Sequence, residues 1–298
     1  MLRMTVKRDI SSNKGQGVFL FLVLLTLGLY FSYRAYRHFN PVIISLPPRP
    51  EVEITIIPGW NLRQVAEYLV LKGLASSTSD VYALTGKPAF FYNYQTGPAP
   101  HLYKKVYIEL YRSQSYEGFL APETYRVFKD ATIRDILEKF VAERDSQFTT
   151  STYERIQQMS KQGILDNYFS VAGNQLLTMA SIIEKETRHE EDRAKVADIL
   201  WRRYKKGWAL QVDSSVHYAI DKTGDVFTTD KERAVNSPWN TYKYPGLPPG
   251  PICNPSIESI KAALYPEKNE YWYFLTGKDG KMYYGKTLEE HNKNKRYL

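Results

Sequence analysis

VEITIIPGWNLRQVAEYLVLKG, residues 52–73, changes its hydrophobic spacing halfway along. The first six residues are rich in β-branched side chains and alternate, which predicts a strand. The segment Pro58-Gly59-Trp60 predicts a turn, and Asn61 is a candidate helix N-cap. Apolar residues then recur at helical spacing up to Gly73: Leu62, Val65, Ala66, Leu69 and Val70. A strand, a turn and a helix in so short a stretch indicate a small α+β module.

The rest of the chain combines helices with one hairpin. Apolar spacing predicts helices over residues 132–140, 151–161, 174–187, 192–204 and 258–265. Residues 271–276 and 282–285 are predicted to be two strands that flank the turn Lys278-Asp279-Gly280. Residues 237–255 contain six prolines, each of which fixes φ, so a loop of fixed shape is expected there. The expected fold class is therefore α+β.

Residues 17–33 form an uncharged apolar run of 17 residues, at the short end of what spans a bilayer. Four basic residues precede the run and two follow it, which favours a cytoplasmic N-terminus and an exported remainder. A cleaved signal peptide is the alternative, but no small-x-small cleavage site follows. We therefore expect a cytoplasmic segment (1–16), an uncleaved transmembrane anchor (17–33) and a Pro-rich linker (34–50).

Composition narrows the classes of function. The 298 residues include 40 Lys+Arg and 32 Asp+Glu, a net charge of +8, which fits a nucleic acid, an anionic membrane or an acidic polymer equally well. A single cysteine, Cys253, excludes an internal disulfide and any multi-cysteine metal site. GxSxG, P-loop and HExxH motifs are absent, and no basic–aromatic stripe predicts a nucleic-acid groove.

The segment LLTMASIIEKET, residues 176–187, carries a candidate catalytic acid. At about 100° per residue, Glu184 lies at the edge of the apolar face of this helix. Partial desolvation would raise its pKa, as a general acid requires. The alternative is a boundary residue whose carboxylate reaches water. Glu186 lies nearer the flank, and a surface ion pair is expected for it.

Two other segments carry polar groups suited to a ligand. The Pro-rich loop presents Asn240, Tyr242 and Asn254, whose uncharged donors and acceptors suit sugar hydroxyls, although a structural brace is an equal alternative. The turn over residues 116–126 contains Glu123, which is either a second active-site acid or an ion-pair partner of Arg126.

Five segments together resemble the YceG-like family of endolytic murein transglycosylases. They are EGFLAPETYRV (117–127), ASIIEKET (180–187), LQVDSSVHYAI (210–220), SPWNTYKYPGLPPGPICNP (237–255) and YFLTGKDGKMYYGKTLEEHN (273–292), in the family's order. The chain departs from the family in three places, one of which is a tail that ends soon after EHN, at Leu298. Asp213 is followed by Ser214-Ser215 rather than Pro-Thr, and the region before EGFLAPETY is shorter than usual.

The resemblance implies a LysM-like subdomain with its connection over residues 51–115 and a catalytic domain over 116–298. It implies an inner-membrane enzyme that cuts nascent peptidoglycan near the elongation machinery and forms 1,6-anhydro ends. It maps the catalytic acid onto Glu184 and requires no metal or cofactor. Residues expected to contact glycan or orient that acid are Gln211, Asp213, Asn240, Tyr242, Asn254, Glu123 and Tyr125.

Three alternatives stay open from the sequence. A hydrolytic muramidase on the same fold would use water in place of the sugar hydroxyl. A peptidoglycan-binding scaffold would have no turnover. A nucleic-acid binder would require the opposite membrane orientation, so nucleic acid is not an expected partner.

Overall fold

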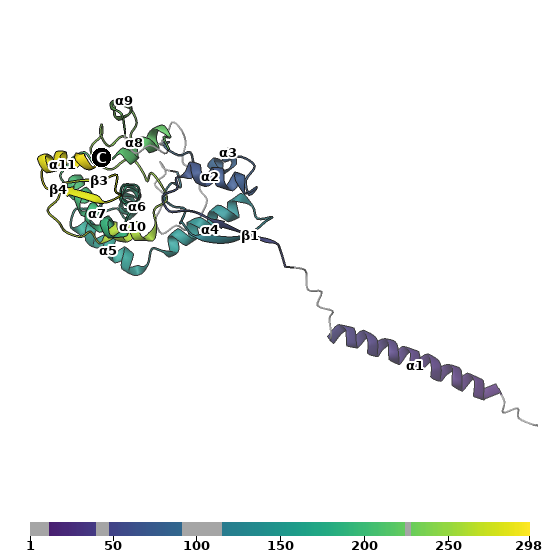
Figure 1. Ribbon diagram of the computed structural model, residues 1–298. Helices are drawn as coiled ribbons and strands as arrows, with labels where there is room; N and C mark the ends of the chain where they lie inside the picture. The colour runs from purple at the N-terminus through teal and green to yellow at the C-terminus, as the bar shows by residue number, and fades with distance from the viewer. Residues whose placement is uncertain (1–11, 40–47, 91–114, 224–227) are drawn as a thin grey trace, which may run out of the picture. The chain divides into compact units, whose positions relative to one another are not determined.

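The computed structural model describes residues 12–39, 48–90, 115–223 and 228–298, and the chain divides into two units, residues 1–49 and 50–298. In the first unit, α1 (Ser12–Phe39) is a single helix (Figure 1). Its segment Gly17–Phe39 has a mean hydropathy of 1.8 and no buried side chains, so it is long and apolar enough to cross a membrane. The predicted N-terminal apolar helix is confirmed, and by length and composition it fits either an anchor or a signal sequence.

The second unit begins with a two-stranded antiparallel sheet. Strand β1 (Glu51–Thr55) pairs with β2 (Thr124–Phe128), and α2 (Leu62–Leu71) and α3 (Thr78–Thr85) lie between the two strands in sequence. Asn61 caps α2 as predicted, and its side chain and that of Gln64 form a reciprocal capping box. Strand β2 lies beyond residue 115, so the sheet takes one strand from each side of the predicted domain boundary.

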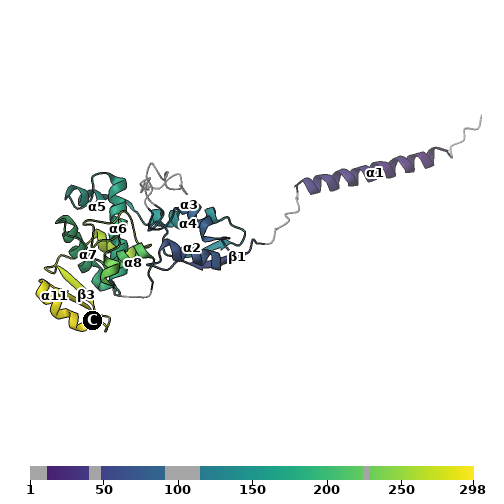
Figure 2. The ribbon, with the colours of Figure 1, turned by 90° about the horizontal axis from the view of Figure 1, so that it is seen from above.

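The predicted helices of the second unit are confirmed, with ends that differ by a few residues. They are α4 (Ile133–Ser146), α5 (Thr150–Lys161), α6 (Phe169–Glu186), α7 (Glu190–Lys205) and α10 (Ile257–Leu264). Helix α6 contacts α5, α7 and α10, which lie around it (Figures 1 and 2). Its residues 176–183 are all buried, so α6 is the central helix of the core.

The C-terminal part supplies a second hairpin and several short helices. Strands β3 (Tyr273–Thr276) and β4 (Met282–Gly285) pair antiparallel as predicted, and α11 (Leu288–Asn294) with the 3-10 turn Lys295–Tyr297 contacts them (Figure 2, yellow). Helices α8 (Asp213–Ile220) and α9 (Asp230–Arg233) have no counterpart among the predicted elements. The mixed α+β class is confirmed.

The Pro-rich loop is fastened to the β1–α2 turn through Asn254. The Asn254 backbone and side-chain amides both donate to Trp60 O, at 2.8 and 3.0 Å, and Asn254 Oδ1 accepts from Leu120 N–H at 3.0 Å. Nearby, Gly118 has a φ of +84°, and a Cβ there would lie 2.5 Å from Pro251 Cγ. Only glycine fits this contact, which brings the loop against the segment before β2.

Candidate active site

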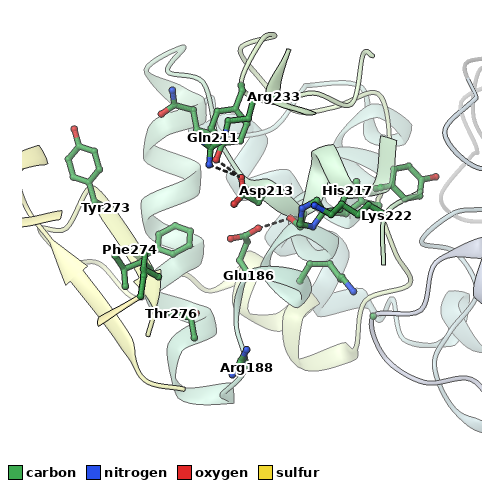
Figure 3. Close-up of a pocket in the computed structure, with 18 of the residues that line it drawn as sticks. Glu186, Arg188, Gln211, Asp213, His217, Lys222, Arg233, Tyr273, Phe274 and Thr276 are labelled. Atoms are coloured by element: carbon green, nitrogen blue, oxygen red, sulfur yellow. Dashed lines mark hydrogen bonds and ion pairs between the residues drawn. The ribbon is translucent and has the colours of Figure 1, made fainter. Parts of the chain in front are cut away.

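A cavity of about 700 Å³ opens in the second unit. Its walls come from the C-terminal end of α6, from α8, from the β1–α2 turn, from the Pro-rich loop and from the β3–β4 hairpin. Figure 3 shows Glu186 of α6, Asp213 and His217 of α8, and Tyr273 and Phe274 of the hairpin around it. The lining is polar on the side of α6 and α8 and aromatic on the side of Tyr273 and Phe274. Such a concave mixture of apolar surface and convergent polar groups is typical of a ligand site.

Glu186, the last residue of α6, lines this cavity. Its Oε1 accepts a hydrogen bond of 2.6 Å from Ser214 Oγ on α8 (Figure 3). Burial raises the pKa of the Glu186 carboxyl, nearby Asp213 raises it further, and Ser214 and Arg203 act in the opposite direction. The expected surface ion pair is replaced by a hydroxyl contact. A partly desolvated carboxyl group that faces a cavity is a candidate general acid.

Glu184 lies elsewhere, in a network beside α10. Its Oε2 accepts three hydrogen bonds, from Ser256 N–H (3.0 Å), Ser256 Oγ (2.5 Å) and Ser259 Oγ (2.6 Å). Its Oε1 lies 3.6 Å from Arg193 Nη2, and only 6% of the side chain is exposed. Glu184 is not among the residues that line the cavity. The carboxylate therefore ties α6 to the start of α10, and its role as an acid stays a prediction.

Three of the predicted contact residues come together in the cavity: Gln211, Asp213 and Tyr242. Tyr242 donates a 2.6 Å hydrogen bond to Asp213 Oδ1, and Arg233 Nη2 lies 3.8 Å from the same oxygen. Burial and this bond to Asp213 raise the pKa of the Tyr242 hydroxyl. Gln211 adopts a left-handed backbone with φ of +54°, which is uncommon for a residue with a side chain.

The other predicted contact residues lie outside the cavity lining. The Asn240 side chain is buried and donates to Arg233 O and Val235 O, both at 2.8 Å, so it shapes the loop that carries Tyr242. Asn254 is buried in the contact with Trp60 described above. Tyr125 is buried and donates to Ala121 O, and Glu123 is exposed and accepts from Thr124 N–H. Glycan contact by these four residues stays a prediction.

The charge of the cavity is predominantly positive. Arg203 and Arg233 line it, and so do Lys185, Arg188 and Lys295, whose side chains have no ion-pair partner among the residues that the structure describes. Such a wall suits a ligand that carries negative charge. Within the same described residues, no group of three or more His, Cys, Asp or Glu side chains could hold a metal ion.

The fold and the cavity define a candidate acid–base site on an α+β scaffold. The chain belongs to the YceG-like family, whose model matches residues 36–297.

Curated relatives support membership of this family. An endolytic murein transglycosylase of Bacillus subtilis is 40% identical over 181 residues, which is 60% of this chain and 47% of that protein. A protein of the same name from Streptococcus pneumoniae is 28% identical over 261 residues, which is 83% of this chain and 45% of that protein. The chain thus spans about half the length of these curated relatives.

A solved structure is similar as well. The crystal structure of a YceG-like protein from Listeria monocytogenes matches with a TM-score of 0.63 and 34% sequence identity, over 84% of this chain and 76% of that chain.

Proposed function

We propose that this protein is an endolytic lytic transglycosylase that cleaves the β-1,4 bond between N-acetylmuramic acid and N-acetylglucosamine in peptidoglycan. Support comes from the family, from the names of the two relatives and from the cavity. The observation that carries the proposal is the carboxyl group of Glu186, which lies at the cavity wall with a raised pKa. Such a group keeps a proton for delivery to a glycosidic oxygen.

In the proposed reaction, protonated Glu186 donates to the bridging oxygen as the glycosidic bond breaks. The resulting carboxylate accepts the proton of the muramoyl C6 hydroxyl, whose oxygen attacks C1 and closes a 1,6-anhydro ring. No water is consumed, and the enzyme returns to its starting protonation state. One acid serves both steps because the nucleophile belongs to the substrate, so the paired carboxylates of ordinary glycosidases are not required.

Geometry favours Glu186 over Glu184, the residue predicted from the sequence. Proton delivery requires an oxygen within hydrogen-bond reach of the substrate. Glu186 borders a cavity large enough for sugar rings, whereas Glu184 Oε2 is surrounded by three donors next to α10. Glu184 is proposed to hold the end of α6 in place.

The glycan is proposed to contact the cavity residues Gln211, Asp213 and Tyr242. Asp213 and Tyr242 offer an acceptor and a hydroxyl that are held by one hydrogen bond, which fixes their direction. Lys185, Arg188 and Lys295 line the wall without an ion-pair partner in the described part of the chain, and such cations suit a polymer that carries carboxylates. No step of the proposed reaction calls for a metal or cofactor.

The remaining predictions concern the setting of the enzyme. Helix α1 is proposed to be an uncleaved anchor with its N-terminus in the cytoplasm and the catalytic unit outside, since basic residues are in excess before the apolar run. The order β1-α2-α3-β2 with antiparallel strands supports a LysM-like subdomain that binds glycan. Action on nascent strands, near the elongation machinery, is part of the same proposal.

Product analysis tests the proposed function. The purified full chain in detergent is incubated with peptidoglycan strands, and the released fragments are weighed by mass spectrometry. Ends that lack one water relative to reducing muramic acid support transglycosylase activity. Reducing ends would support the hydrolytic muramidase, and binding without cleavage would support the scaffold.

A further inference from the structure

Helix α8 joins the candidate acid to a buried cluster around Glu117, and Tyr218 of this cluster also lines the cavity. At its N-terminal end, Ser214 donates to Glu186. Near its C-terminal end, the Tyr218 hydroxyl donates to Glu117 Oε2 at 3.0 Å. Eight helical residues span about 12 Å and behave as one rigid piece. A constraint on Tyr218 therefore acts on the position of Ser214.

Glu117 is placed to supply that constraint. Glu117 is 2% exposed. Both of its carboxylate oxygens lie 3.0 Å from the backbone nitrogen of Leu62, the first residue of α2, and accept its N–H. A carboxylate at a helix N-terminus is favoured by the unpaired N–H groups there. Burial nevertheless raises the pKa of Glu117 to about 7, with the Leu62 N–H, Tyr218 and Arg63 opposing the rise. Glu117 does not line the cavity.

Tyr218 is held from two further directions. Its hydroxyl accepts from Ala89 N–H at 2.9 Å. Its backbone carbonyl accepts from Arg63 Nη1 at 3.2 Å, and the Arg63 guanidinium lies 5.0 Å from the centre of its ring. Arg63 Nε is in turn 3.3 Å from Asp221 Oδ1, just after α8. The C-terminal end of α8 is thereby fixed to α2 and to the turn that carries Glu117.

We propose that Glu117 and Tyr218 are positioning residues for the reaction: they hold α8 in the orientation at which Ser214 Oγ contacts the carboxyl group of Glu186. The proposal rests on the proposed function. It explains why a glutamate without access to the cavity is buried at the start of the EGFLAP turn, where a neutral side chain would avoid the cost of desolvation.

The readout is the pH dependence of catalysis. Besides Ser214, Glu186 faces Arg203 on α7, Tyr242 on the Pro-rich loop and Asp213 on α8, and the Asp213 carboxylate is also held from outside α8 by Tyr242 and Arg233. The Ser214 hydroxyl donates to the charged form of Glu186 and so opposes the rise of its pKa. Loss of that contact moves the alkaline limb of the kcat profile to higher pH.

The experiment is a double-mutant cycle in the full chain, with Tyr218→Phe, Ser214→Ala and both together, and kcat and KM measured across pH. We expect Tyr218→Phe to lower kcat about fivefold, to leave KM near the wild-type value and to move the alkaline limb upward in the same direction as Ser214→Ala. In the Ser214→Ala background, Tyr218→Phe adds little to either effect. The matched control is Tyr204→Phe on α7, which loses a hydrogen bond from Gln175 of α6 and does not involve α8.

The outcomes distinguish a failure of the positioning role from a failure of the proposed function. An alkaline limb that Tyr218→Phe leaves in place, or effects of the two substitutions that multiply, would overturn the positioning role. If Tyr218→Phe does not fold, Glu117→Gln provides the same readout, because glutamine keeps an acceptor for Leu62 N–H. If the wild-type chain forms no anhydro ends, the proposed function fails and the positioning role with it. Wild-type activity with an unmoved limb removes the positioning role alone.

Discussion

Glu184 and Glu186 are separated by one residue on α6, yet their carboxylates contact different parts of the protein. Glu184 accepts hydrogen bonds from Ser256 and Ser259 at the start of α10, and Glu186 accepts one from Ser214 on α8. Residues that are two positions apart on a helix differ by about 200° in direction, so the two side chains leave α6 on nearly opposite sides. The neighbours on each side decide which of them faces the ligand cavity.

The catalytic rate should fall as the pH rises through the pKa of Glu186 in the folded protein. The first step needs its protonated form, and burial raises that pKa, so the active form persists to higher pH than for an exposed glutamate. Above the pKa, kcat drops about tenfold per pH unit. Initial rates of anhydro-end formation measure this limb, with circular dichroism at each pH as the control for folding. A rate that climbs steadily into alkaline pH contradicts the assignment.

Glu117 should make the folded state less stable as the pH rises. Its pKa is about 7 in the folded protein against an ordinary 4.5, so between these values the folded state binds the additional proton. Stability from this group is present at low pH and is lost as the pH rises through this window, by about 3 kcal/mol in total.

Urea unfolding of Glu117→Gln and of the wild type, at about pH 4 and about pH 8, measures this effect. Glutamine does not titrate, so the variant should gain about 3 kcal/mol on the wild type between the two pH values. Taking the difference between the two proteins removes the contribution of the other titrating groups. An equal pH dependence for both would show that the carboxyl group of Glu117 has an ordinary pKa.

Gly118→Ala should destabilise the protein more than an ordinary glycine substitution. Its φ of +84° is strained for alanine, and the new Cβ would lie 2.5 Å from Pro251 Cγ, so the Pro-rich loop must shift. We expect a loss of about 3 kcal/mol or more. Gly163→Ala is the control, because Gly163 has a φ of +66° with no atom within 4 Å of the Cβ position. That substitution should cost about 1 kcal/mol. Equal losses in urea unfolding would argue against the close contact.

Asn254→Ala and Gln211→Ala should separate structure from binding. Asn254→Ala leaves Leu120 N–H without its side-chain acceptor in a buried contact, and we expect a loss of about 3 kcal/mol in unfolding free energy.

Gln211 is exposed at the cavity wall, so Gln211→Ala should raise KM and change stability by no more than about 0.5 kcal/mol. A stable Asn254→Ala with a raised KM would instead favour direct glycan contact by Asn254, as predicted from the sequence.

Much of the fold could be predicted because it depends on local spacing. The helical pattern of 174–187 lies within α6 apart from its last residue, and the cap at Asn61 follows from its place after a turn. Strand β2 was not predicted, because five residues with one buried face carry little signal and its partner lies far back in sequence: Thr55 and Thr124 pair across 69 positions. Helix α8 has few apolar residues and was missed for a similar reason.

The candidate acid needed information that the helix itself does not hold. Spacing gives the angle between Glu184 and Glu186 but not which element covers each side. Glu184 meets Ser256, 72 positions later, whereas Glu186 meets Ser214, 28 positions later. Tyr242, predicted from its chemistry, and Asp213, predicted from the family resemblance, do line the cavity. Asn240 and Asn254 were predicted in the same way, but the Asn240 amide donates to Arg233 O and Val235 O, and the Asn254 amide donates to Trp60 O in the β1–α2 turn.

The most direct test compares Glu186→Gln with Glu184→Gln in the full chain, through the yield of 1,6-anhydro ends by mass spectrometry and the unfolding free energy of each variant. The account predicts that Glu186→Gln abolishes anhydro ends in a protein that stays folded. It predicts that Glu184→Gln is less stable, because amide and hydroxyl donors then compete near Ser256, yet still forms anhydro ends. Anhydro ends from Glu186→Gln, together with none from a folded Glu184→Gln, would contradict the assignment.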